Sequence, residues 1–375
     1  MKKPLIGYKK TRRVEVVLIV LVCVLALAAR QVSINREILG VICLLCLAAF
    51  VVIDWLFGRC PHCGRNLDPL RFWRNRGVCP HCGEPLDEEP LPRHVEETAS
   101  AKVNLTLAVG EKRPDGYHEV ETVMTCAALC DSVILDRNAG PWDKLVCDPP
   151  VTERSGDNLC MKALRLFFQE LGVKEDFVTI TLEKHIPTQA GLGGGSSDAA
   201  AVLRGLRAMY APELSDERLE KMAAQLGSDV PFFIRGGTAL ATGRGEVLHG
   251  LPRMPECWFV IVKPEESHST AAMFAAIDSA PGRTGGDSRT VREGLEKGDL
   301  SAIAAGMGND FQQVLPENSA VPAIVKALRQ QGALNAQMTG SGSAVFSLFA
   351  CQADAETASE ALKKNYPCTF CVTQV

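Results

Sequence analysis

Residues 187–201, PTQAGLGGGSSDAAA, have the composition of a loop that holds phosphate. Glycine has no Cβ and can adopt positive φ, so the backbone N–H groups of such a loop can approach an anion closely. Ser196 and Ser197 stand where a helix is expected to begin, and the free N–H groups of a first helical turn attract phosphate. The loop lacks the Gly-Lys-Ser/Thr of a P-loop, and Ser196 replaces the last glycine of G-x-G-x-x-G. By itself, the stretch fits a flexible turn as well as a phosphate site.

Two further groups could act on a bound phosphate. The alternating pattern from Val103 to Val109 predicts a strand with Lys102 and Asn104 on one face. A lysine beside a phosphate site can stabilise the charge of a phosphoryl group in transfer. Asp229 precedes an apolar run, and an acid in such surroundings is costly unless it is paired. The pattern alone leaves two ordinary alternatives open, a solvated strand face and a capping aspartate.

The pentapeptide CPHCG occurs twice, with fifteen residues between the two copies. The resulting spacing, C-x2-C-x15-C-x2-C, is typical of a four-thiolate zinc site in which each pair of cysteines forms a tight turn. Four thiolates leave no open coordination position, so we expect a structural Zn²⁺. The expected ligands are Cys60, Cys63, Cys79 and Cys82. A redox dithiol or two unrelated turns are the alternatives.

Two apolar runs, at residues 16–29 and 38–53, follow a start of thirteen residues that carries six basic residues and no acidic one. Each run is somewhat shorter than the about 20 residues that cross a bilayer, which flanking residues can extend. Because basic residues cluster before the first run and after the second, the positive-inside rule predicts a hairpin with both ends in the cytoplasm. A cleavable signal peptide ending near residues 26–28, and two buried helices of a soluble domain, are the alternatives.

The composition allows two or three domains in the 375 residues, with 46% hydrophobic and 22% charged residues. A net charge of −4 does not favour nucleic acid as a partner, and none is expected. The 15 cysteines are scattered and odd in number, which suits a reducing compartment better than a disulfide scaffold. Proline and acidic residues at 84–98 indicate a linker between the cysteine pairs and the remainder of the chain.

Periodicity and turn residues predict the elements that must position these groups. Strands are expected where apolar residues alternate or run together, and helices where they recur at helical spacing. The expected elements are a strand at 178–186, helices at 199–210 and 214–226, a hairpin at 238–248, a strand at 258–264, a helix from 269, helical segments around 289–305 and 319–331, and a strand from 344.

Five motifs in order resemble the GHMP kinase superfamily over about residues 98–375. They are AKVNL at 101–105, RPDGYH at 113–118, AGLGGGSSDAAA at 190–201, GSDVPFF at 227–233 and TGSGSA at 339–344. The resemblance implies an α+β two-domain GHMP kinase fold, with an S5-like N-terminal domain at 99–252 and a ferredoxin-like C-terminal domain at 253–375. Preceding it we expect a basic N-terminus and transmembrane hairpin at 1–57, a zinc ribbon at 58–86 and a linker at 87–98.

The resemblance also implies roles for individual residues. Lys102 and Asp229 match the catalytic pair, with Asp229 accepting the proton of the attacking hydroxyl. The implied ATP-binding residues, acting with Mg²⁺, are Lys184, Pro187, Ala190, Gly191, Leu192, Gly193, Gly194, Gly195, Ser196 and Ser197. The implied substrate-binding residues are Asn104, Tyr117, His118, Ser269, Thr270, Thr339, Gly340 and Ser341. Asp198 is expected to have a structural or N–H-binding role.

The narrower resemblance is to the branch that phosphorylates an alcohol carrying a cytidine diphosphate group, in isoprenoid precursor synthesis. Tyr117 would stack on the cytosine and His118 would hydrogen-bond to it. Three positions depart from the pattern: Gln189, Ser228 and His268, the last standing where a smaller apolar residue is usual. Two other functions stay open. The chain could phosphorylate a different small alcohol, or be a membrane-bound zinc-ribbon interaction protein with a degenerate kinase domain.

Overall fold

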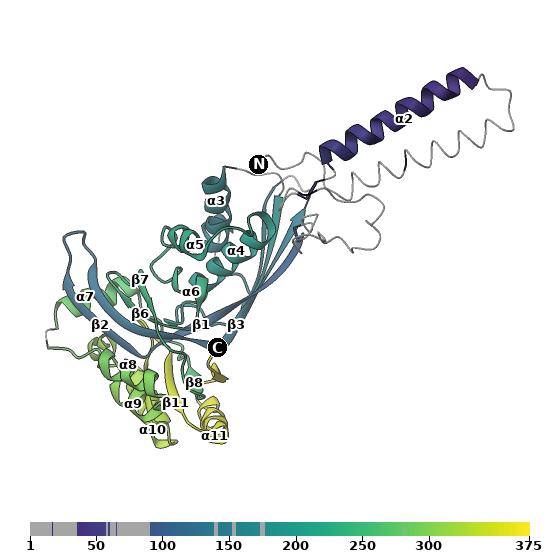
Figure 1. Ribbon diagram of the computed structural model, residues 1–375. Helices are drawn as coiled ribbons and strands as arrows, with labels where there is room; N and C mark the ends of the chain where they lie inside the picture. Colours follow the sequence, from purple (N-terminus) through teal and green to yellow (C-terminus); the bar gives the residue numbers. More distant parts are fainter. Residues whose placement is uncertain are drawn as a thin grey trace. The chain divides into compact units, whose positions relative to one another are not determined.

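The structure is a computed structural model of the chain, and it divides into two compact units, Met1–Pro90 and Leu91–Val375. Figure 1 shows the elements, coloured along the sequence. The structure describes residues 17, 36–57, 59–60, 65, 91–138, 142–151, 155–172, 177–280 and 282–375.

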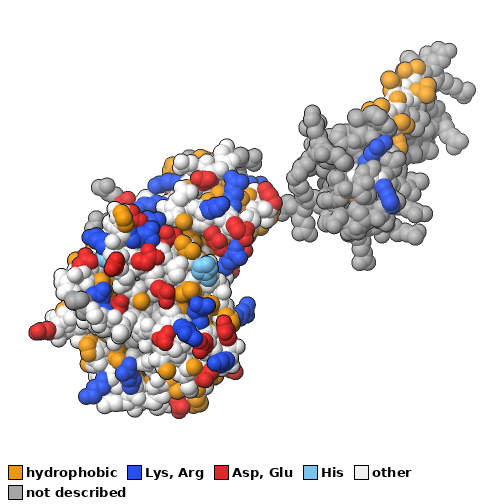
Figure 2. Space-filling view, turned by 60° about the vertical axis from the view of Figure 1, so that its left-hand side comes forward, with side chains coloured by type: hydrophobic (Ala, Val, Ile, Leu, Met, Phe, Trp, Pro, Cys, Tyr) orange, Lys and Arg blue, Asp and Glu red, His pale blue; other side chains and the backbone are white. Residues whose placement is uncertain are grey.

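In the first unit, helix α2 (Arg36–Phe57) contains the second predicted apolar run. Its side chains Leu44, Leu45 and Val51 are more than half exposed, and Figure 2 shows apolar side chains along this helix. Within the described part of the chain, no helix combines the length and apolar character needed to span a membrane. The predicted pair of transmembrane helices is therefore not confirmed: the second run has only sixteen uncharged residues, and the first lies, apart from Val17, outside the described residues.

The predicted zinc ribbon is described at only one of its four cysteines. Cys60 is buried, and its backbone N–H donates to the carbonyl oxygen of Arg65 at 2.9 Å. Cys63, Cys79 and Cys82 lie outside the described residues. Among the residues that are described, no group of three or more His, Cys, Asp and Glu side chains could hold a metal. The structural zinc is not confirmed and stays a prediction.

The second unit begins with a sheet centred on the long strand β3 (His118–Asn138), which pairs with four other strands. Its remaining members are β1 (His94–Asn104), β2 (Thr106–Lys112), β4 (Lys144–Asp148), β5 (Phe177–Glu183), β6 (Thr238–Thr242), β7 (Val247–Gly250) and β9 (Gly308–Asn309). β1 starts at His94 and pairs with β3 from that residue, and the alternate residues Val95 and Glu97 are half-buried against the sheet. The last five residues of the predicted linker 87–98 therefore belong to the sheet.

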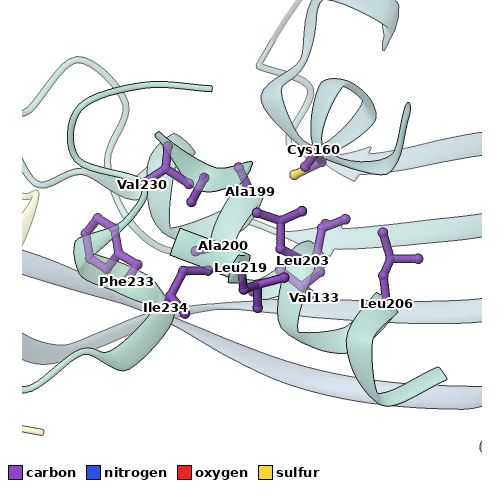
Figure 3. Packing of buried hydrophobic residues seen from close by; sticks show 14 of the residues in the cluster. Val133, Cys160, Ala199, Ala200, Leu203, Leu206, Leu219, Val230, Phe233 and Ile234 are labelled. Atoms are coloured by element: carbon purple, nitrogen blue, oxygen red, sulfur yellow. The ribbon is translucent and has the colours of Figure 1, made fainter. Parts of the chain in front are cut away.

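Helices pack against this sheet and bury its inner face. They are α3 (Leu159–Leu171), α4 (Gly194–Tyr210), α5 (Asp216–Ala223), the short α6 (Phe232–Arg235), and a preceding 3-10 turn η2 (Ser155–Asp157). Figure 3 shows α4 in the middle of the cluster, which contains Ala199, Leu203 and Leu206 of this helix and Val133 of β3. Small residues early in α4 let the helix pack closely against the sheet, and this packing fixes the first turn of α4 relative to the sheet.

The C-terminal half forms a four-stranded antiparallel sheet in the order β10-β11-β8-β12. Its strands are β8 (Trp258–Val262), β10 (Asn335–Met338), β11 (Val345–Phe349) and β12 (Thr369–Thr373). The helical elements are α7 (Thr270–Asp278), α8 (Ser288–Lys297), α9 (Leu300–Gly306), η3 (Asp310–Val314), α10 (Val321–Gln330) and α11 (Gln352–Lys363). In chain order, helices separate β8 from β10 and β11 from β12. This connectivity and the strand order are those of a ferredoxin-like sheet. The predicted helical segment 289–305 is two helices, because Gly298 ends α8 in a left-handed conformation and Asp299 caps α9.

The two halves of this unit share one hydrophobic cluster. Val103 and Leu105 of the first sheet pack in the same buried cluster as Phe259, Phe346 and Leu348 of the second sheet. β9, which follows α9, pairs in parallel with β2 and so adds a C-terminal segment to the first sheet. The halves are therefore held in a fixed relation, which is needed for a site built from both.

Candidate active site

A cavity of about 770 Å³ lies where the two halves of the second unit meet. Both predicted catalytic residues, Lys102 and Asp229, line it. So do seven of the eight predicted substrate-binding residues: Asn104, Tyr117, His118, Ser269, Thr270, Gly340 and Ser341. Thr339 is fully buried beside the cavity and does not line it.

A second cavity, of about 370 Å³, lies on the other side of the glycine loop. The predicted ATP-binding residues line it with the exception of Ser197, and they are joined by Asp157, Asn158 and Asp198. Gln189, Gly191, Gly193 and Ser196 line both cavities. The loop is therefore a partition through which groups bound on its two sides could meet.

The glycines of this loop are needed for its shape. Gly191 and Gly193 have φ of +77° and +73°. A Cβ at Gly191 would lie 2.2 Å from the carbonyl oxygen of Thr339, and one at Gly193 would lie 2.8 Å from the ring of Phe233. Because Gly193 has no side chain to cap α4, the first N–H groups of this helix remain available to a ligand. The geometry fits the phosphate loop predicted from the sequence.

Asn104 is the junction of a hydrogen-bond network beneath the larger cavity. Its Oδ1 accepts from Lys102 Nζ at 2.5 Å and from the backbone N–H of Gly340 at 2.9 Å. Its Nδ2 donates to Thr122 Oγ1 at 2.8 Å, and its backbone N–H donates to Thr339 Oγ1 at 3.1 Å. The Asn104 side chain, which was predicted to bind substrate, is thus largely engaged in fixing Lys102 and the second glycine loop (residues 339–343).

Lys102 is buried, and this burial lowers the pKa of its amine, with the nearby Asp229 carboxylate acting in the opposite direction. Asp229 is half-buried in the turn between α5 and α6. The two side chains therefore form a cation and a carboxylate on the wall of one cavity, close enough to affect each other. Such a pair can take a proton from a hydroxyl and stabilise negative charge on the group that receives it.

Lys184 lies beside the glycine loop in a buried cluster of three charges. Its Nζ donates to Asp131 and, at 2.7 Å, to Asp198 Oδ2. Burial raises the pKa of Asp198 to about 7, against the opposing effect of Lys184. Asp131 also accepts from the backbone N–H groups of His185 and Ile186, at 2.5 and 2.8 Å. The cluster anchors the segment that enters the loop, so Asp198 has the structural surroundings expected of it, and the lysine charge is largely neutralised.

The far end of the larger cavity is aromatic. The His118 ring stacks on Phe274 with 5.0 Å between centroids, and its Nε2 lies 2.7 Å from Asp278 Oδ1. Hydrogen bonding to His118 lowers the pKa of Asp278. Tyr117 is 56% exposed, and the guanidinium of Arg244 lies 4.8 Å from its ring centroid. This end suits a flat ring with polar edges.

Phe274, Asp278 and Arg244 were not predicted from the sequence. Phe274 and Asp278 are four residues apart on α7 and therefore share one helix face. That spacing could have indicated a shared helix face. It does not indicate that this face contacts His118, which lies 160 residues before Asp278 in the chain. Arg244 lies in the turn of a hairpin, where an arginine is ordinarily solvated.

The sequence and fold are similar to those of known proteins. The profile of the GHMP kinases N terminal domain matches residues 158–237, and that of GHMP kinases C terminal matches residues 291–368. The chain belongs to the GHMP kinase family. It is similar to the 4-diphosphocytidyl-2-C-methyl-D-erythritol kinase of Macrococcus caseolyticus, with 40% identity over 268 residues, 71% of this chain and 94% of that protein. The enzyme of the same name from Listeria monocytogenes is 43% identical over 254 residues, 67% of this chain and 86% of its own length.

Solved structures agree with these sequence matches. A crystal structure of 4-(cytidine 5'-diphospho)-2C-methyl-D-erythritol kinase is similar with a TM-score of 0.64 and 32% identity, covering 75% of this chain and 99% of that one. The mevalonate kinase of L. major, at 20% identity and a TM-score of 0.60, shares the fold over 76% of this chain and 98% of its own. The predicted two-domain GHMP kinase fold is thus confirmed.

We expect Lys184→Met to destabilise the second unit by about 3–5 kcal/mol, because two buried carboxylates would face each other without their cation. Chemical denaturation at pH 8 measures this loss. Adding Asp198→Asn should restore a large part of it, since the amide removes one of the two like charges. A Lys184→Met variant as stable as the unaltered chain would show that the cluster does not hold the loop.

Proposed function

We infer that this chain transfers the γ-phosphoryl group of ATP to the 2-hydroxyl of 4-diphosphocytidyl-2-C-methyl-D-erythritol, a step in non-mevalonate isoprenoid precursor synthesis. The observation that carries this function is the glycine loop standing between two cavities, with Lys102 and Asp229 on the wall of the larger one. The relatives that carry this activity in their names match the chain across both kinase domains.

The smaller cavity suits the phosphates of ATP. Its floor is the loop whose backbone leaves no room for a Cβ at Gly191, and its wall includes the first turn of α4. ATP supplies the phosphoryl group, and Mg²⁺ bound with it would neutralise part of the phosphate charge. Because a magnesium ion of this kind is held largely by phosphates and water, a dedicated cluster of protein carboxylates is not required.

The residues of the larger cavity divide the chemistry between them. Asp229 accepts the proton of the substrate hydroxyl as it attacks, and Lys102 stabilises the negative charge that moves onto the phosphoryl oxygens. Asn104 keeps the Lys102 amine in place through the 2.5 Å hydrogen bond. Since burial lowers the pKa of this amine, its proton is held less firmly than that of a solvated lysine.

The aromatic end of the cavity suits the cytosine. Tyr117 offers a ring face on which a pyrimidine can stack, and His118, stacked on Phe274, offers a ring edge for hydrogen bonds. Asp278 fixes the orientation of His118 through its 2.7 Å contact. A kinase for a small alcohol without a base would have no use for this end, which favours the cytidine compound over the alternative substrates.

Asp229→Asn should lower kcat by about 10²–10⁴-fold, because general-base catalysis contributes that much and the amide cannot accept the proton. The KM for ATP should change little, since the residue lies outside the smaller cavity. The assay follows ADP release from Mg-ATP with 4-diphosphocytidyl-2-C-methyl-D-erythritol as acceptor.

Asp354→Asn on α11, an exposed position remote from both cavities, is the matched control and should behave as the unaltered chain. Full activity of Asp229→Asn would place the base elsewhere. Transfer by the unaltered chain to another alcohol but not to this compound would overturn the substrate. No transfer to any alcohol would favour the interaction protein with a degenerate kinase domain.

We also propose that residues 1–57 attach the protein to a membrane and leave the kinase portion in the cytoplasm. The exposed apolar side chains of α2 and the basic first thirteen residues support this arrangement. The full chain should sediment with membranes and be released by detergent but not by high salt, whereas a variant beginning at residue 91 should stay in solution. Recovery of the full chain in solution without detergent would contradict the tether.

We further propose that residues 58–86 bind one structural Zn²⁺ through Cys60, Cys63, Cys79 and Cys82, as the spacing of the cysteines indicates. Metal analysis of the purified full chain should give about one zinc per chain. Cys79→Ser should lower this ratio severely, whereas Cys351→Ser, at an exposed free cysteine, should not. Equal zinc content in both variants would exclude the proposed ligand set.

A further inference from the structure

His268 lines the larger cavity, and the proposed mechanism gives it no role. It lies in the segment 263–269, between β8 and α7, where the family pattern favours a small apolar residue. Its side chain is only 10% exposed. A nine-tenths buried imidazole at the edge of a substrate cavity is a costly replacement for an aliphatic side chain, because its two nitrogens need hydrogen-bond partners.

The segment that carries His268 is held firmly. The Glu266 carboxylate accepts from Ser319 Oγ at 2.7 Å and from the backbone N–H of Ala320 at 3.1 Å. The backbone carbonyl oxygen of Glu266 accepts from Lys263 Nζ at 2.7 Å and from the hydroxyl of Ser343. The backbone two residues before His268 is therefore held in place.

The ring itself is in contact with the second glycine loop. Its Cδ2 lies 3.1 Å from the place that a Cβ of Gly342 would take. Its Nε2 is buried and has no hydrogen-bond partner among the described residues, while Glu266 Oε1 lies 3.5 Å away. An imidazole ring can donate a hydrogen bond from a ring N–H to a ligand.

The corner of the cavity around His268 is rich in groups that can bind an anion. The Ser269 side chain makes no capping hydrogen bond to α7, so the first N–H groups of this nine-residue helix are not occupied by their own cap. Thr270 Oγ1 and Ser341 Oγ lie 2.9 Å apart at the same place. Hydroxyls, free helix N–H groups and an imidazole together suit a phosphate.

We propose that His268 binds the diphosphate of the cytidine substrate, donating a hydrogen bond from its ring to a phosphate oxygen. The inference rests on the proposed function, because it needs a substrate that carries phosphate between its base and its reacting hydroxyl. The same cavity has groups that suit both ends of that substrate, with Phe274 at the aromatic end and Asp229 at the reacting end. The phosphates of ATP are the other candidate for the phosphate that His268 binds. They are disfavoured because residues 267–270 line the larger cavity but not the smaller one.

His268→Val in the full chain should raise the KM for the cytidine substrate by about 10–100-fold, the range of a charge-assisted hydrogen bond, and change the KM for ATP less than about twofold. Binding of CDP, measured by calorimetry, should weaken by a similar factor. Binding of cytidine, which has no phosphate, should not change. A residue that only shapes the cavity would not separate CDP from cytidine in this way.

His249→Val is the matched control, because this histidine is exposed on β7 and should leave all four measurements unchanged. His268→Lys, which also offers an N–H donor, should retain CDP binding better than His268→Val, and it serves as the second variant if the valine variant does not fold. Equal weakening of CDP and cytidine, or a rise in the KM for ATP alone, would overturn the proposal. If the unaltered chain phosphorylates no cytidine compound but binds CDP in a His268-dependent way, the substrate assignment fails and the phosphate subsite stands.

Discussion

The backbone contact between the two glycine loops is the constraint on which the site depends. A Cβ at Gly191 would lie 2.2 Å from the carbonyl oxygen of Thr339, so no other residue fits between the loops. In the same seam, the backbone N–H of Ala344 donates to the carbonyl oxygen of Ala190 at 3.0 Å. One loop precedes α4 and the other precedes β11, so this seam ties the two sheets together at the place where both cavities open. The sequence shows the two loops as separate motifs, at 190–201 and 339–344, and the structure shows them in direct contact with each other.

The same seam sets the position of Lys102, the lysine proposed to act in catalysis. Asn104 Oδ1 accepts from Lys102 Nζ and from the backbone N–H of Gly340, so the amine and the second loop share one acceptor. A buried polar network whose members are satisfied gains rigidity from the low dielectric around it. The charge of Lys102 is therefore held at the cavity wall by contacts from strand β1 and from a loop more than two hundred residues later in the chain.

The sequence predicted the parts of the site that are encoded locally. The glycine loop, the strand bearing Lys102, the turn before Tyr117 and the position of Asp229 each follow from short patterns or motifs, and the structure brings them to one cavity. It did not predict that β1 begins at His94, because the acidic, proline-rich segment before it read as a linker. The sequence did not predict the partners of His118 either. Asp278 and Phe274 lie on α7, and the periodicity of this helix does not indicate which residues it contacts.

The two cavities differ in how far apart in the sequence their lining residues lie. Every residue that lines the smaller one falls between 151 and 198, within one stretch of the first domain, so a local motif suffices to specify it. The larger one draws residues from 102 to 342, and its shape exists only when both halves are folded against their shared hydrophobic cluster. The proposed phosphoryl donor site can therefore remain unaltered while side chains such as His268, contributed by the second half, adjust the proposed acceptor site. Because the seam between the loops is backbone, these adjustments can be made without moving the lysine or the loop that separates donor from acceptor.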